Sequence, residues 1–139
     1  EAHWSALLTL TRGKTVFTRP LALDVEARLS ASDSRPIVAL FRNQEGWRPS
    51  FLAEAMTVED ISGSGTLKLR DRRLSVPGAW LSSDNIRTGV KGMLEPGGNE
   101  GRIYLEYGKL GLLLKLTNGK RNIDIIRPKA KYDAYRAPE

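Results

Sequence analysis

Side chains able to carry out acid–base chemistry are few in this chain, and the most suggestive are Asp24 and Glu26. These two residues alternate along a predicted strand, so their carboxyl groups share one face, about 6.6 Å apart. Paired carboxylates at such a distance act together in glycoside hydrolases. Arg28 follows on the same face, however, and no part of the pattern forces burial. We therefore interpret the pair as part of a solvated outer face.

The other catalytic and ligand-binding patterns are incomplete. His3 is the only histidine, and the chain has no cysteine. The sequence therefore offers no Ser-His-Asp relay, no thiol chemistry and no His/Cys metal cluster. Gly63 and Gly65 precede a predicted strand and not a helix N-terminus, so we expect them to serve tight turning instead of phosphate binding. We predict a non-enzymatic domain without metal or cofactor.

The chain as a whole shows the period-two alternation of apolar and polar residues that predicts β-strands with one buried face. The stretch 101–117 shows it on both sides of a glycine turn, and 21–29 shows it without interruption. One-sided alternation favours an antiparallel sheet with a solvated face. Turns are indicated at Gly13–Lys14, at 71–73 and, by the strongest hairpin signal, at Asn118–Gly119. The predicted strands cover 3–12, 21–29, 61–70, 74–81, 85–94, 101–107, 110–116 and 122–127.

Two segments between the second and third strands have helical character. Apolar residues recur at helical spacing in 34–41 and again in 49–56, which predicts two short helices. Helices this short are not stable alone in water, so we expect them to lie against the sheet. The predicted fold class is mostly β. It is a curved antiparallel or mixed sheet of about nine strands, an open trough or half-barrel, with the two helices covering one end.

The charge of the chain is strongly asymmetric. The net charge is +6, and five of these six charges arise in 102–139, a region that ends in a polar tail without a predicted helix. Such a balance suits an anionic partner, either nucleic acid or lipid headgroups, or else a solvated basic surface. Single-strand binders also need exposed aromatic rings. Trp4 and Tyr107 fall on apolar strand faces, although Trp80, Tyr104, Tyr132 and Tyr135 are still available. The candidate basic surface consists of Lys109, Lys120, Arg121, Arg127, Lys129 and Lys131.

Several glycine- and leucine-rich features of 61–127 occur together. They are the strand entry ISGSGTLKL at 61–69, the strand at 74–81, Gly92-x-Leu94 before a loop, and the run at 101–113 with Asn118–Gly119 after it. These features resemble the C-terminal region of AsmA-like proteins, the envelope family that includes TamB and YdbH. The helical segment at 34–41 and the motif at 46–49 are similar to the helical piece that precedes those strands in such proteins.

The resemblance implies an inner-membrane-anchored protein of a Gram-negative bacterium with a β-rich body in the periplasm. Because the chain begins at Glu1 without a methionine, we expect a fragment of such a protein, a single C-terminal domain over 1–139. The family's elongated members carry phospholipid toward the outer membrane along an apolar trough. The resemblance thus implies functional residues that form a lipid-facing or core wall, with Leu23, Val25, Leu67, Leu69, Leu105, Leu112, Leu114 and Leu116 as the candidates.

Three functions follow from these observations. The first is a non-enzymatic domain that binds acyl chains of phospholipid or another envelope lipid on an apolar sheet face, in lipid transport or outer-membrane biogenesis. The second is an assembly module that pairs with a protein partner, or with itself, through an open sheet edge. The third is a basic nucleic-acid-binding β domain, against which the placement of the aromatic residues argues.

Overall fold

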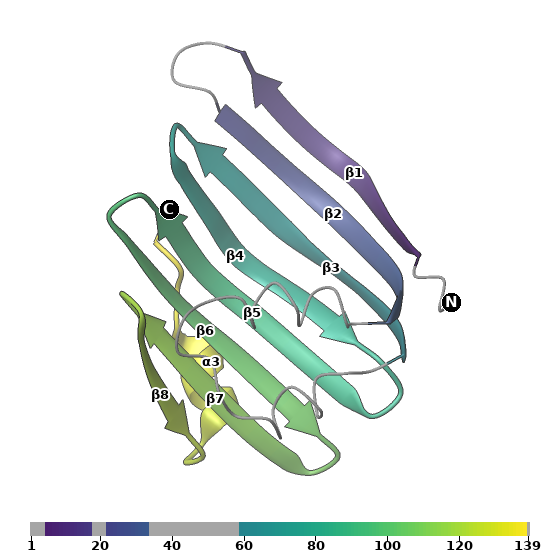
Figure 1. Cartoon of the computed structure of the whole chain (residues 1–139), viewed down its shortest axis with the longest axis vertical. Coiled ribbons are helices and arrows are strands. Elements are labelled where there is room, and N and C mark those ends of the chain that lie inside the picture. The colour runs from purple at the N-terminus through teal and green to yellow at the C-terminus, as the bar shows by residue number, and fades with distance from the viewer. Residues whose placement is uncertain (1–4, 18–21, 34–58, 139) are drawn as a thin grey trace.

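The computed structural model describes residues 5–17, 22–33 and 59–138. Over these residues the chain forms one sheet of eight antiparallel strands, arranged in the order of the sequence (Figure 1). Within this part of the chain the sheet is open, since β1 at one edge and β8 at the other do not pair. The strands are β1 (Ala6–Val16), β2 (Ala22–Asp33), β3 (Glu59–Arg70), β4 (Arg73–Ser82), β5 (Ile86–Glu95), β6 (Gly98–Tyr107), β7 (Leu110–Thr117) and β8 (Lys120–Asp124).

The predicted mostly β fold with an antiparallel sheet is confirmed, with eight strands described against about nine expected. The glycine turn within 101–117 joins β6 to β7, and Tyr107 pairs with Leu110 across it. Asn118 and Gly119 form the turn between β7 and β8, with φ angles of 48° and 78°. Positive φ at both central residues is what a type I′ hairpin turn requires, as the sequence predicted.

Two turn predictions are wrong. Gly13–Lys14 lies inside β1, where Gly13 pairs with Val25 after an irregularity in the β1–β2 register. Gly63 and Gly65 lie in the middle of β3 and not at a turn. A Cβ added at Gly65 would come 2.5 Å from the Cβ of Ala79 on β4. These two glycines therefore permit close packing of neighbouring strands.

The helix content also differs from the prediction of two short helices. Both predicted segments, 34–41 and 49–56, lie outside the described residues. The one helix in the described part of the chain is α3 (Pro128–Ala134), within the tail for which no helix was predicted. Pro128 stands in its first turn, where the missing backbone N–H is tolerated. The last predicted strand, 122–127, is correspondingly shorter, since β8 ends at Asp124.

The strand registers give the sheet two chemically different faces, because residues opposite one another in a pair of strands share a face. Val25 of β2 pairs with Leu67 of β3, whereas the preceding residue Asp24 pairs with Lys68. The same alternation continues across the sheet. Helix α3 lies against the second, polar face, over β6 and β7 (Figure 1).

The most tightly packed part of the described chain lies where α3 meets the sheet. Tyr132 of α3 is 1% exposed, and its ring centroid lies 5.4 Å from that of Trp80 and 5.8 Å from that of Tyr104. Leu113 of β7 belongs to the same cluster and is fully buried. Gly89 of β5 leaves room for the Tyr132 side chain, since a Cβ added at Gly89 would lie 2.6 Å from the Tyr132 hydroxyl oxygen. Aromatic packing in a notch of the sheet thus holds a helix too short to form alone.

We expect Leu113→Ala to destabilise the domain by about 2–5 kcal/mol, because it leaves a cavity inside the aromatic cluster. Leu110→Ala on the same strand is the matched control. Leu110 is 74% exposed, and its truncation should change the free energy of unfolding by less than about 0.5 kcal/mol. Urea unfolding of both variants measures the difference. Equal effects at the two positions would show that Leu113 is not a core residue.

Candidate functional surface

The side of the sheet that α3 does not cover carries mostly apolar side chains. From β3 to β7, the only charged residue on this side is Glu59, at the first position of β3. We call this surface the apolar face. It comprises Leu8, Leu10, Leu23, Val25, Ala27, Ala31, Ile61, Leu67, Leu69, Leu74, Val76, Ala79, Leu81, Ile86, Val90, Leu94, Ile103, Leu105, Tyr107, Leu110, Leu112, Leu114, Leu116 and Ile123.

The eight residues predicted to form an apolar wall all lie on this face. Val25 and Leu114 are buried, with 6% and 8% of their surface exposed. The other six are partly buried, and they are Leu23, Leu67, Leu69, Leu105, Leu112 and Leu116. They come from four strands, β2, β3, β6 and β7, and the strand registers place them on one face.

The predicted wall leaves out several strongly exposed members of the apolar face. Leu8 and Leu10 of β1 are each 60% exposed, and Leu94 of β5 is 55% exposed. The alternation that identified the wall residues runs through these positions too and could have identified them. Strongly exposed apolar side chains that share one face of a sheet are typical of contact surfaces. The apolar face is therefore the candidate contact surface.

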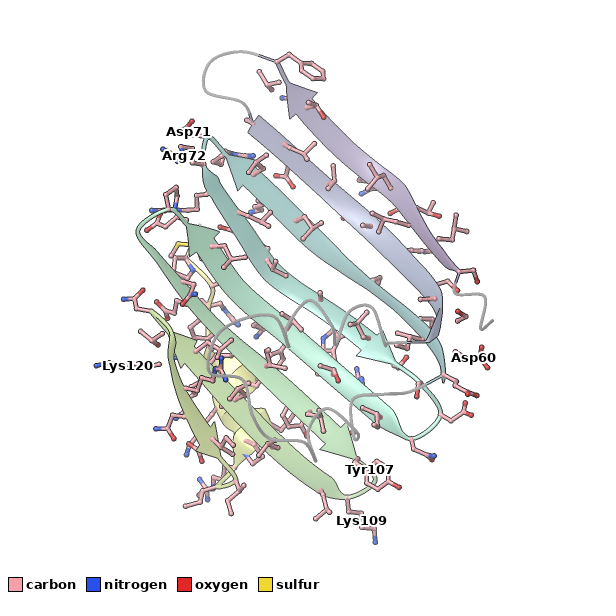
Figure 2. The ribbon with its side chains drawn as sticks, in the orientation of Figure 1. Asp60, Asp71, Arg72, Tyr107, Lys109 and Lys120 are labelled. Atoms are coloured by element: carbon pink, nitrogen blue, oxygen red, sulfur yellow. The ribbon has the colours of Figure 1, made fainter. Side chains whose placement is uncertain are left out.

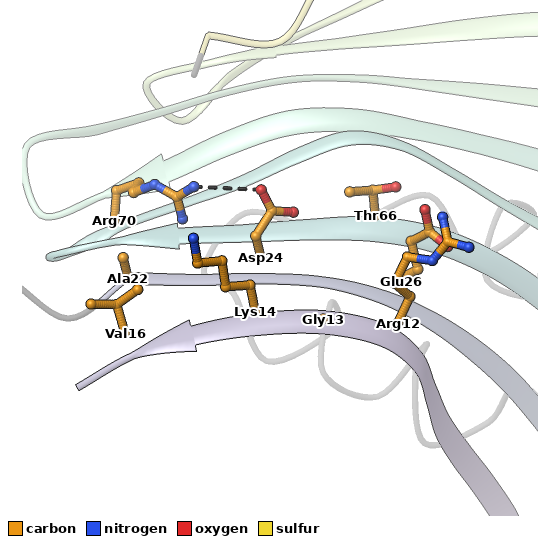
Figure 3. A pocket seen from close by; sticks show the side chains of 9 residues that line it. All are labelled: Arg12, Gly13, Lys14, Val16, Ala22, Asp24, Glu26, Thr66 and Arg70. Carbon is orange, nitrogen blue, oxygen red and sulfur yellow. Dashed lines mark hydrogen bonds and ion pairs between the residues drawn. The ribbon is translucent and has the colours of Figure 1, made fainter.

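The predicted carboxylate pair lies on the polar face, beside an open cavity of about 400 Å³ (Figure 3). Asp24 accepts a hydrogen bond from Arg70 Nη2 at 3.4 Å, and its side chain is 42% exposed. Glu26 is exposed as well. Both carboxyl groups are open to solvent, and that of Asp24 is paired with a cation. The geometry agrees with a solvated outer face.

The six predicted basic-surface residues are all exposed, but they do not form one patch. Lys109 lies in the β6–β7 turn, and Lys120 lies at the opposite end of β7, where β8 begins (Figure 2). Arg121 follows Lys120 on β8, and Arg127 immediately precedes α3. On α3 itself, Lys129 forms an ion pair with Asp133, and Lys131 forms one with Asp124, leaving little of their charge uncompensated.

Cations and aromatic rings meet between α3 and the polar face. The Lys91 ammonium lies 4.4 Å from the Tyr132 ring centroid and donates hydrogen bonds to the carbonyl oxygens of Tyr132 and Tyr135. Burial lowers the pKa of Lys91. The Tyr104 hydroxyl donates to Glu106 at 2.7 Å, and burial raises the pKa of Tyr104 to about 12. Tyr104 and Tyr132, considered above as rings for base stacking, are thus buried structural residues.

No protein-family model, curated protein or solved structure matches this chain. The resemblance to AsmA-like proteins therefore stays a prediction. Within the described ranges, no group of three or more side chains is arranged to hold a metal ion. In the same part of the chain, no helix has the length and apolar character needed to cross a membrane.

Asp124 joins β7, β8 and α3 through its carboxylate. It accepts hydrogen bonds from Lys131 Nζ at 2.6 Å, Lys115 Nζ at 2.9 Å and the Ile126 backbone N–H at 3.0 Å. These interactions, with that of Lys131 the largest, lower the pKa of Asp124 well below its ordinary value. The carboxylate is therefore charged throughout the neutral range and holds the connection between the sheet edge and α3.

We expect this carboxylate to make stability depend on acid pH. Because the pKa of Asp124 is lower in the folded than in the unfolded chain, its contribution is complete above about pH 4 and is lost as the pH falls further. Asp124→Asn should lower the melting temperature at pH 7 and should weaken its decrease between about pH 4 and pH 2. Glu26→Gln, at an exposed carboxylate on β2, is the control. Parallel pH profiles for Asp124→Asn and the parent would contradict the assignment.

Proposed function

We propose that this domain holds lipid acyl chains against its apolar face, as a non-enzymatic part of an inner-membrane-anchored envelope protein acting in the periplasm. Its role is in phospholipid transport or outer-membrane assembly. The observation that carries the proposal is the continuity of the apolar face from β1 to β7, together with the exposure of Leu8, Leu10 and Leu94 on it. Fully burying one such side chain is worth about 1.5–3 kcal/mol, so a ligand that covers several of them gains a large hydrophobic contribution.

The chemistry of the apolar face supports an acyl chain in particular. From β3 to β7 its side chains are almost entirely aliphatic, with Thr88 as one of the few polar exceptions. An acyl chain has no hydrogen-bonding groups to satisfy, whereas a protein partner presents backbone polar groups that need partners when buried. The aromatic rings of Trp80 and Tyr104, which would suit a protein interface, lie on the opposite face against α3.

A second function, strand addition at an open edge, is favoured by β1. This strand has 11 residues, and within the described part of the chain it pairs on one side only, with β2. Leu7, Leu8 and Leu10 leave it apolar and exposed on both faces. Long exposed edge strands are templates for pairing with another chain. The edge could be occupied by a protein partner or by a second copy of the domain.

The test is extraction of lipid from the natively purified protein, followed by mass spectrometry. Leu8→Asp and Leu94→Asp should remain folded, since both side chains are more than half exposed, but should retain far less lipid. Leu7→Asp is the matched control: Leu7 is adjacent to Leu8 and 66% exposed, but it pairs with Ser30 and lies on the polar face. It should retain as much lipid as the parent.

The outcomes separate the two functions. Bound lipid in the parent that is lost in Leu8→Asp and kept in Leu7→Asp supports acyl binding. Equal retention in all three proteins contradicts the assignment to the apolar face. Absence of lipid from the parent, combined with concentration-dependent self-association in light scattering, supports edge pairing through β1 instead.

A further inference from the structure

One end of the sheet concentrates large apolar side chains that no other described residue covers. Tyr107 and Leu110 flank the β6–β7 turn and are 54% and 74% exposed. Ile125 and Ile126, in the connection between β8 and α3, are 73% and 69% exposed. We call these four residues, with Lys109 and Arg127 beside them, the tip. Figure 2 shows Tyr107 and Lys109 at one end of the sheet, with Asp71 and Arg72 at the other.

The connection from β8 to α3 is held beside the β6–β7 turn by contacts at both of its ends. Asp124 pairs with Leu113 of β7. On the other side of the connection, the Pro128 side chain lies 3.2 Å from a Cβ built at Gly111. Residues 125–127 therefore run alongside the first half of β7, between the positions opposite Leu113 and Gly111. Two segments 15 residues apart in the sequence thus expose large apolar side chains at the same end of the sheet.

The charges at the tip are of one sign. Lys109 and Arg127 are exposed, and within the described residues neither contacts an acidic side chain. Three nearby acidic groups are already engaged: Asp124 with Lys115 and Lys131, Asp133 with Lys129, and Glu106 with the Tyr104 hydroxyl. Asp84 is exposed in the β4–β5 turn, two residues before the partner of Tyr107, and offsets only part of the charge of the two cations. The tip therefore presents apolar side chains together with positive potential.

We propose that the tip docks on the surface of an anionic lipid bilayer. Leu110, Ile125 and Ile126 enter the boundary between headgroups and acyl chains, Tyr107 lies at headgroup depth, and Lys109 and Arg127 contact lipid phosphates. Apolar residues beside cations are the combination that interfacial binding requires, because apolar burial and attraction to anionic lipid add together. Tyrosine, with an apolar ring and a polar hydroxyl, suits this depth. The inference rests on the proposed function only in taking lipid as the ligand class.

Vesicle flotation tests the proposal. The probes are vesicles of phosphatidylcholine alone and vesicles containing equal parts of phosphatidylcholine and phosphatidylglycerol. The parent should bind the anionic vesicles, less tightly as salt increases, and should bind the neutral ones weakly. Ile125→Ser combined with Ile126→Ser should reduce binding about tenfold or more, because two buried apolar side chains are lost. Arg127→Glu should reduce it roughly tenfold, because each cation near an anionic surface favours binding.

Two matched controls lie at the opposite end of the sheet. Phe17, at 89% exposure, follows β1 next to the beginning of β2, and Arg72 is exposed in the β3–β4 turn. Phe17→Ser and Arg72→Glu should bind vesicles as the parent does. Reductions equal to those of the tip variants would overturn the proposal and indicate nonspecific adsorption. Equal binding of the parent to neutral and anionic vesicles would also overturn it.

A second measurement reports which end enters the membrane. The chain has no cysteine, so a single introduced cysteine can be labelled without background. An environment-sensitive fluorophore on Ile126→Cys should shift to shorter emission wavelength on anionic vesicles, and the same label on Phe17→Cys should not. The reverse pattern contradicts the tip assignment.

The proposed function and this inference fail separately. Loss of vesicle binding in the Ile125/Ile126 variant with co-purified lipid retained supports docking as an activity distinct from acyl binding. A parent that binds vesicles through the tip but carries no extractable lipid contradicts the acyl-binding proposal and supports the docking proposal. Absence of vesicle binding from a parent that does carry extractable lipid overturns docking alone.

Discussion

An open sheet with one apolar face must hide that face from water, and the other features of this structure depend on how it does so. The requirement is met unevenly. Val25 and Leu114 are almost completely buried, whereas Leu8, Leu10 and Leu94 on the same face are more than half exposed. Each exposed leucine forgoes part of the roughly 1.5–3 kcal/mol that burial would contribute. Against a typical domain stability of about 5–15 kcal/mol, several such residues are a substantial deficit, which a bound ligand is well suited to remove.

The two faces of the sheet differ in the kinds of side-chain contact they make. On the polar face, Trp80, Tyr104 and Tyr132 pack with Leu113 under a helix of seven residues, and cations such as Lys91 lie over the rings. This arrangement is specific in geometry, since rings and cations have preferred orientations. On the apolar face, aliphatic side chains offer area without directional contacts. The polar face holds α3 in one geometry, whereas the ligand proposed for the apolar face would be free to vary in length and position.

Local pattern accounted for the sheet, and tertiary contacts accounted for what the sequence analysis missed. Period-two alternation identified the strands and the shared face of the wall residues, and Asn118–Gly119 identified its turn, because these signals are properties of adjacent residues. Helix α3 gives a weak local signal, since it is seven residues long and is stabilised by Tyr132 entering a notch at Gly89. The exposed fraction of each side chain could not be predicted from the sequence either. Alternation places Leu114 and Leu8 on one face, but only the assembled structure shows one buried and the other open.

The apolar face and the tip meet at Tyr107 and Leu110, which belong to both. From there Leu112 and Leu114 continue along β7 on the same side, one residue about every 6.7 Å. An acyl chain that leaves a bilayer into water loses about 0.8 kcal/mol for each methylene group, or roughly 12 kcal/mol for a chain of about sixteen carbons. A continuous aliphatic path removes most of that barrier, because each methylene exchanges membrane for leucine instead of water. If the tip sits at a bilayer, the path from membrane to sheet has no polar step between Leu110 and Leu114. The proposed docking and the proposed acyl binding, although separable in experiment, would thus use adjacent parts of one surface.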